Sequence, residues 1–106
     1  MLRRLELSVT QMARIVDRAH SRNIHAIVTV FSTELVDGAE SLPWDAYKTA
    51  SPDIVHRPLL ERLVATGKPL VISTGASTID EVSRALGWMA GRDASVRARM
   101  AVLQCV

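Results

Sequence analysis

The sequence contains little of what marks several classes of protein. Cys105 is the single cysteine in 106 residues, so an internal disulfide is impossible and a disulfide-framework fold is excluded. No apolar run reaches the roughly 18 residues of a membrane-spanning helix, and no apolar stretch follows the basic residues near Met1 as a secretory signal requires. We therefore expect a cytoplasmic protein without a membrane partner.

The net charge is small, and aromatic residues are few. The chain has 13 Lys and Arg against 11 Asp and Glu, and a net charge of +2 gives no reason to expect a nucleic-acid partner. One Phe, one Tyr and two Trp leave the core mostly aliphatic. A hydrophobic fraction of 48% argues against disorder, and 106 residues fit one domain, with no second domain.

The sequence does contain segments with the apolar spacing of helices, which alternate with short apolar segments typical of strands. Helical spacing and capping residues alternate with short β-branched runs from Ser8 to the end of the chain. Residues 91–99 are expected to form a polar loop in which the arginines are solvated. The expected helices are 8–23, a short stretch within 34–42, 58–67 and 78–90, and the expected strands are 24–31, 46–51, 70–74 and 101–106.

This order predicts an α/β fold built of parallel βα units. The strands are apolar on both faces, which is typical of a parallel sheet that helices cover. The pattern alone leaves open a doubly wound sheet or part of a (β/α)8 barrel.

Polar side chains gather where three of these strands end. The first strand is followed by Ser32-Thr33, the second carries Lys48 and ends at Ser51, and the third ends in Ser73-Thr74-Gly75. The carboxyl ends of parallel strands meet at one edge, where α/β folds place their sites. An ammonium group and several hydroxyls suit an anion. The alternatives without a ligand are an ordinary capped turn at Ser73–Gly75 and a lysine that reaches solvent at an exposed sheet edge.

Other reactive residue types give weaker signals. The three histidines share no metal-ligand spacing, so we expect surface or structural roles for them and predict no metal site. Cys105 is expected to be a buried small hydrophobe, because no local pattern would activate a thiolate.

The strand-end motifs resemble the N-acetylneuraminate (sialic acid) synthase family. The motifs that carry the resemblance are Phe31-Ser32-Thr33, the stretch Ala46 to Ser51 (A-Y-K-T-A-S), the run from Pro58 to Gly75 with G-K-P and S-T-G, and Val102 to Cys105. The A-Y-K-x-A-S and G-K-P…S-T-G motifs are specific for the family when they occur together. The order of all the motifs matches that of the family over nearly the whole chain.

The resemblance implies a partial TIM (β/α)8 barrel, with about four of the eight strands. Members condense phosphoenolpyruvate with an N-acyl mannosamine-type sugar, form a carbon–carbon bond and release phosphate, with a divalent metal (Mn or Mg) on the sugar aldehyde. The resemblance places phosphoenolpyruvate at Thr33, Lys48 and Ser73, with Ser51 and Gly75 nearby, and it places Asp53 on the sugar side.

The sequence departs from the family in ways that matter. Glu34 replaces a proline and adds a negative charge, and Gln104 stands where a histidine is frequent. The family's metal-binding histidines have no counterpart in this chain, so we expect residues 1–106 alone to bind no metal and to be inactive. The alternatives are a small non-catalytic module that binds a phosphorylated ligand at the Ser73–Gly75 turn and a scaffold without a ligand. Open sheet edges predict possible homo-oligomers.

Overall fold

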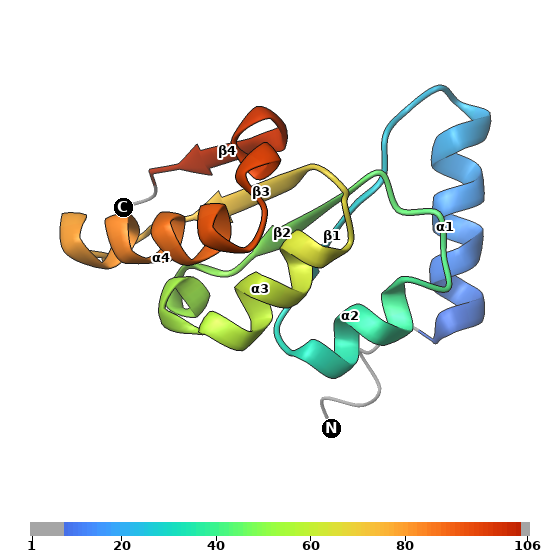
Figure 1. The fold of residues 1–106 in the computed structure, drawn as a ribbon. Helices are drawn as coiled ribbons and strands as arrows, with labels where there is room; N and C mark the ends of the chain where they lie inside the picture. The colour runs from blue at the N-terminus through green and yellow to red at the C-terminus, as the bar shows by residue number, and fades with distance from the viewer. Residues whose placement is uncertain (1–7, 105–106) are drawn as a thin grey trace.

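The computed structural model describes residues 8–104, which form a four-stranded sheet with helices between the strands (Figure 1). The sheet has the order β1-β2-β3-β4 and every neighbouring pair is parallel. No helix within these residues is long and apolar enough to cross a membrane. The elements in chain order are α1 (Val9–Ser21), β1 (Ile27–Val30), α2 (Thr33–Ala39), β2 (Ala46–Thr49), the 3-10 helix η2 (Ser51–Val55), α3 (Arg57–Ala65), β3 (Leu70–Ser73), α4 (Ile79–Arg92), the 3-10 helix η3 (Ala94–Arg99) and β4 (Met100–Leu103).

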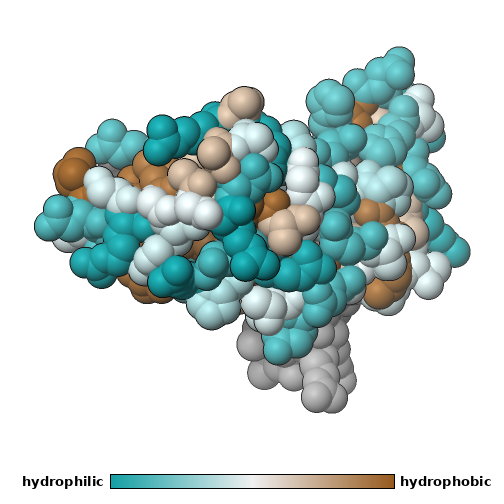
Figure 2. All heavy atoms as spheres, viewed as in Figure 1, coloured by the Kyte–Doolittle hydropathy of each residue, from teal (hydrophilic) through white to brown (hydrophobic). Residues whose placement is uncertain are grey.

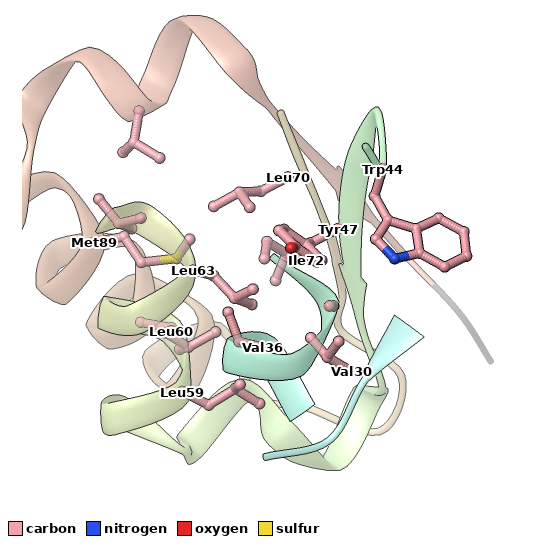
Figure 3. Close-up of a cluster of buried hydrophobic side chains, with 14 of the residues drawn as sticks. Val30, Val36, Trp44, Tyr47, Leu59, Leu60, Leu63, Leu70, Ile72 and Met89 are labelled. Carbon is pink, nitrogen blue, oxygen red and sulfur yellow. The ribbon is translucent and has the colours of Figure 1, made fainter. Parts of the chain in front are cut away.

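One aliphatic core joins the helices to one face of the sheet. Alternate strand residues such as Tyr47, Leu70 and Ile72 are buried there, as period-two side-chain alternation requires. Leu63 of α3 and Met89 of α4 are fully buried in the same cluster (Figure 3). In the view of Figure 1, hydrophilic side chains cover much of the surface, with smaller apolar areas between them (Figure 2).

The opposite face of the sheet is not covered by any described helix. Thr29, Lys48 and Val71 lie side by side in one row across β1, β2 and β3, and all three are half-buried. On the same face of β1, Ile27 is 51% exposed. This is the face that would line the interior of a parallel barrel.

The predicted helix ends are confirmed where local chemistry sets them. Ser8 with Gln11 and Thr78 with Glu81 form the two capping boxes, in which each side chain accepts a backbone N–H of the other residue. Gly67 has a φ of 75°, which favours glycine after a helix.

The prediction of a loop at 91–99 was wrong. Helix α4 continues through Gly91 to Arg92, and Asp93 then caps η3 by accepting the N–H of Ser95. Arg92 and Arg97 are exposed, as predicted, but Arg99 is mostly buried, and its guanidinium donates to the carbonyl oxygens of Lys68 (2.7 Å) and Val64 (3.1 Å). These bonds join η3 to the end of α3.

The strands are shorter than predicted, and each has four residues in the structure. The second predicted strand ends at Thr49, and Ser51 begins η2, which the sequence analysis did not predict. The fourth strand ends at Leu103, and the prediction for Cys105 lies outside the described residues.

Candidate functional site

Hydrogen bonds draw the ends of β2 and β3 together at one edge of the sheet. The Ser51 hydroxyl accepts the N–H of Gly75 at 3.0 Å, and the Thr49 hydroxyl accepts the N–H of Ser73 at 3.4 Å. The predicted residues Ser51, Ser73 and Gly75 are therefore neighbours in the structure. The Gly75 amide is already used to position Ser51, so it is not free to bind an anion.

Ser73 is the most unusual polar residue of this edge. Its exposure is 2%, and its Oγ has no hydrogen-bond partner among the described residues. A buried hydroxyl without a partner is costly, and such groups are rare in folded proteins. The Ser73 hydroxyl therefore has hydrogen-bonding capacity that no described residue uses.

Lys48 lies on the uncovered face, beside Thr29 and Val71. Its Nζ donates to the carbonyl oxygen of Thr49 at 3.3 Å, and within residues 8–104 no carboxylate forms an ion pair with it. A half-buried ammonium without a carboxylate partner is suited to meet an external anion.

Thr33 and Asp53 stand near the same edge on different elements. Thr33 is the first residue of α2, where the hydroxyl of the preceding Ser32 accepts the N–H of Leu35. The register of β1 with β2 pairs Val30 with the strand-end residue Thr49, so both strand ends lie at one level. Asp53 lies in η2, and both Thr33 and Asp53 are half-buried.

The turn after β3 opens onto a pocket of about 500 Å³ that extends along the start of α4. Ala76 has a φ of 59° in this turn, a left-handed conformation that non-glycine residues seldom adopt. The α4 N-terminus is a poor anion site, because Thr78 caps it and Asp80 and Glu81 place negative charge in its first turn. The lining residues are Thr74, Ala76, Ser77, Thr78, Ile79, Val82, Ser83 and Gln104.

Two threonines tie the strand ends together: Thr49, which the sequence analysis did not name as a candidate, and Thr74, which it named within the Ser73-Thr74-Gly75 turn. Besides Thr49, the hydroxyl of Thr74 donates to the carbonyl oxygen of Leu103 at 2.7 Å and so joins the end of β3 to β4. The presence of a threonine at the end of each of two consecutive parallel strands was the sequence signal that could have predicted these hydrogen bonds.

Two of the three histidines, His20 and His25, lie at the opposite edge, where the strands begin, whereas His56 lies between η2 and α3. Asp45 accepts hydrogen bonds from the Ala26 N–H (2.6 Å) and from His20 Nε2 (2.7 Å), and His25 Nδ1 lies 3.6 Å from its other oxygen. The Ala26 hydrogen bond and then the one with His20 hold the pKa of Asp45 below its usual value. This cluster fastens the end of α1 to the start of β1.

The family resemblance implies a divalent metal, for which the side chains present would have to supply ligands. Within residues 8–104, no group of three or more His, Cys, Asp or Glu side chains could hold a metal ion. The described residues therefore do not fit a metal, and no step of the chemistry below is assigned to one.

Comparison with known proteins places this geometry in a family. The model of the NeuB family matches residues 1–106. An uncharacterized protein of Methanocaldococcus jannaschii is 37% identical over 82 residues, and N,N'-diacetyllegionaminic acid synthase of Campylobacter jejuni is 27% identical over 105 residues. The matched parts cover 77% and 99% of this chain but only 24% and 31% of those proteins.

A solved structure shares the fold. The N-acetylneuraminic acid (sialic acid) synthetase of Leptospira borgpetersenii superimposes with a TM-score of 0.85 at 22% identity, over 95% of this chain and 34% of that one. The parallel βα units are thus part of a TIM-type barrel, as the sequence analysis predicted.

Proposed function

Because this chain belongs to the NeuB family, we propose that residues 1–106 form the phosphoenolpyruvate side of a sugar synthase that condenses phosphoenolpyruvate with an N-acyl amino sugar and releases phosphate. The observation that carries the proposal is the junction of β2 and β3. There the unpaired ammonium of Lys48, the unpartnered hydroxyl of Ser73 and the Ser51–Gly75 hydrogen bond lie at neighbouring strand ends.

Each residue has a role that its chemistry supports. The Lys48 ammonium neutralises negative charge on phosphoenolpyruvate, and the hydroxyls of Ser73 and Thr33 donate hydrogen bonds to its oxygens. Ser51, fixed by the Gly75 amide, sets the shape of the pocket wall. Asp53 faces the sugar substrate.

The chain spans 22% to 31% of the length of the curated relatives it matches. The proposal is therefore that residues 1–106 bind phosphoenolpyruvate without completing the reaction. Synthase activity should return when the chain is mixed with the complementary part of a relative's barrel.

Titration of the chain with phosphoenolpyruvate by calorimetry tests the binding proposal. Charge-assisted hydrogen bonds contribute about 1.5–3 kcal/mol, so Lys48→Met should weaken binding roughly 10- to 150-fold. Arg84→Met removes the same charge from an exposed position of α4 and should leave the affinity within about twofold. Equal affinity of the Lys48→Met variant and the original chain would disprove the role of Lys48.

The runner-up is a non-catalytic module that binds a phosphorylated ligand at the Ser73–Gly75 turn. The unpartnered Oγ of Ser73 favours it as well. Such a module should bind inorganic phosphate as tightly as phosphoenolpyruvate, whereas a site for phosphoenolpyruvate should prefer the substrate that also carries a carboxylate. A scaffold should bind neither.

A further inference from the structure

On the basis of that function, we propose that Thr49 is a positioning residue. It holds Lys48 and Ser73, the two groups that carry the proposed phosphoenolpyruvate site, in one fixed arrangement. Thr49 stands at the unspecified position of the A-Y-K-x-A-S motif, so the family resemblance assigns it no role.

Thr49 contacts both groups where the ladder between β2 and β3 ends. The register of the two strands ends at Lys48 and Val71. A continued parallel ladder would next pair the Ser73 N–H with the carbonyl oxygen of Thr49. Instead, the Ser73 N–H donates to Thr49 Oγ1 at 3.4 Å, and the Thr49 carbonyl oxygen accepts Lys48 Nζ at 3.3 Å. The Thr49 side chain thus replaces one rung of the sheet and leaves its carbonyl oxygen to the ammonium.

The Thr49 side chain does not itself face a ligand on the uncovered side of the sheet. It lies two residues after Tyr47 on the face that the helices cover, and it is fully buried. Ser73 lies two residues after Val71 and therefore shares the face of Lys48. Any effect of the Thr49 hydroxyl on binding has to pass through the residues that it holds.

The turn after β3 is fixed at each of its first amides. The N–H groups of residues 73–75 are accepted by the Thr49 hydroxyl, by the carbonyl oxygen of Leu103 at 3.0 Å and by the Ser51 hydroxyl. The Ser73 hydroxyl has no partner among the described residues. A fixed backbone that carries an unpaired hydroxyl is preorganised for a ligand, which then loses less entropy on binding.

The chemistry of threonine suits this task. A β-branched side chain has few χ1 rotamers, so a buried threonine keeps its hydroxyl in one place. Valine has nearly the same shape without the hydroxyl, and serine keeps the hydroxyl without the second methyl group. Thr49→Val and Thr49→Ser therefore separate the hydrogen bond from the packing.

A double-substitution cycle, read by calorimetric titration with phosphoenolpyruvate, tests the positioning role. Ser73→Ala should weaken binding about 10- to 150-fold, because it removes a hydrogen bond to a charged ligand. Thr49→Val should weaken it about 2- to 10-fold, because the Ser73 hydroxyl is no longer held in place. In the Ser73→Ala background, Thr49→Val should have no further effect. Equal effects in both backgrounds would indicate a merely structural role and overturn the proposal.

Two control variants accompany the cycle. Thr49→Ser keeps the hydroxyl and should bind within about twofold of the original chain. Thr66 lies at the opposite edge of the sheet, and its hydroxyl donates to the carbonyl oxygen of Leu63 at 2.7 Å. Thr66→Val removes the same chemical group and should leave the affinity unchanged. Equal losses in Thr49→Ser and Thr49→Val would assign the effect to packing and contradict the positioning role.

The same titrations separate failure of this proposal from failure of the proposed function. If the original chain does not bind phosphoenolpyruvate, both fail. If the original chain binds it and Ser73→Ala loses affinity while Thr49→Val does not, the proposed function stands and the positioning role of Thr49 is overturned.

Hydrogen exchange at the Ser73 amide provides a measurement without a ligand. The amide should be protected in the original chain and in Thr49→Ser, and it should exchange faster in Thr49→Val. Rapid exchange in the original chain would show that the Thr49 hydroxyl does not hold this strand end. That result would overturn the proposal even where Thr49→Val fails to fold.

Discussion

Tyr47 is the residue of the core whose hydroxyl group should matter most for stability. Its side chain is fully buried, and its hydroxyl donates to Oε2 of Glu40, which also accepts from Lys68 Nζ at 2.8 Å. The Lys68 ammonium lies 5.2 Å from the centre of the Tyr47 ring. A hydrogen bond to a charged group contributes about 1.5–3 kcal/mol. We expect Tyr47→Phe to lower the free energy of unfolding by about that amount, which urea unfolding at pH 7 measures.

The pH dependence follows from Glu40. Partial burial raises the pKa of Glu40. The hydrogen bonds from Lys68 and Tyr47 and the nearby positive charges lower it by a larger amount, so the pKa lies below its ordinary 4.5. A lowered carboxyl pKa stabilises the fold above the ordinary value, and this contribution disappears as the pH falls through the pKa of the folded state. The cost of Tyr47→Phe should therefore shrink as the pH falls through the lowered pKa of Glu40. A cost under about 0.5 kcal/mol at pH 7, or one unchanged at pH 3, would refute this reasoning.

Three further substitutions test other parts of the fold. Leu63→Ala, at a fully buried position, should cost about 2–5 kcal/mol in urea unfolding. Gly67→Ala meets no atom within 4 Å but keeps a φ of 75°, so strain alone should cost about 1–2 kcal/mol in the same assay. Asp45→Asn weakens the link to His20, and hydrogen exchange should show a less protected Ala26 amide. Unchanged protection would show that the carboxylate charge is not needed.

Features that depend only on residues close together in the sequence could be predicted. A capping box needs only Thr78 and Glu81, three residues apart, and it was found correctly. The polar strand ends could also be predicted, because parallel strands place Lys48 and Ser73 at one edge wherever the helices lie. Contacts between distant residues were out of reach. The Ser51–Gly75 bond joins residues 24 apart, and nothing in the local pattern marks it.

The wrong prediction for residues 91–99 has a physical reason. The predicted loop began at Gly91, and glycine has a low helix propensity. Helix α4 passes through it because the preceding turn is fixed by the buried Met89, and tertiary packing outweighs propensity. Arg99 is held by carbonyl groups that lie more than 30 residues away in the sequence, so charge alone indicated solvent.

The two edges of the sheet differ in how their polar groups are paired, and this difference separates stability from binding. Where the strands begin, Asp45 and Glu40 each accept two hydrogen bonds, and Arg99 donates two. Where the strands end, the Ser73 hydroxyl has no partner among the described residues, and Lys48 has no carboxylate. Removal of a paired group leaves its partner buried and unsatisfied, whereas removal of an unpaired group leaves nothing behind. Substitutions of Asp45, Glu40 or Arg99 should therefore lower stability, and substitutions of Lys48 or Ser73 should lower ligand affinity while the fold is retained.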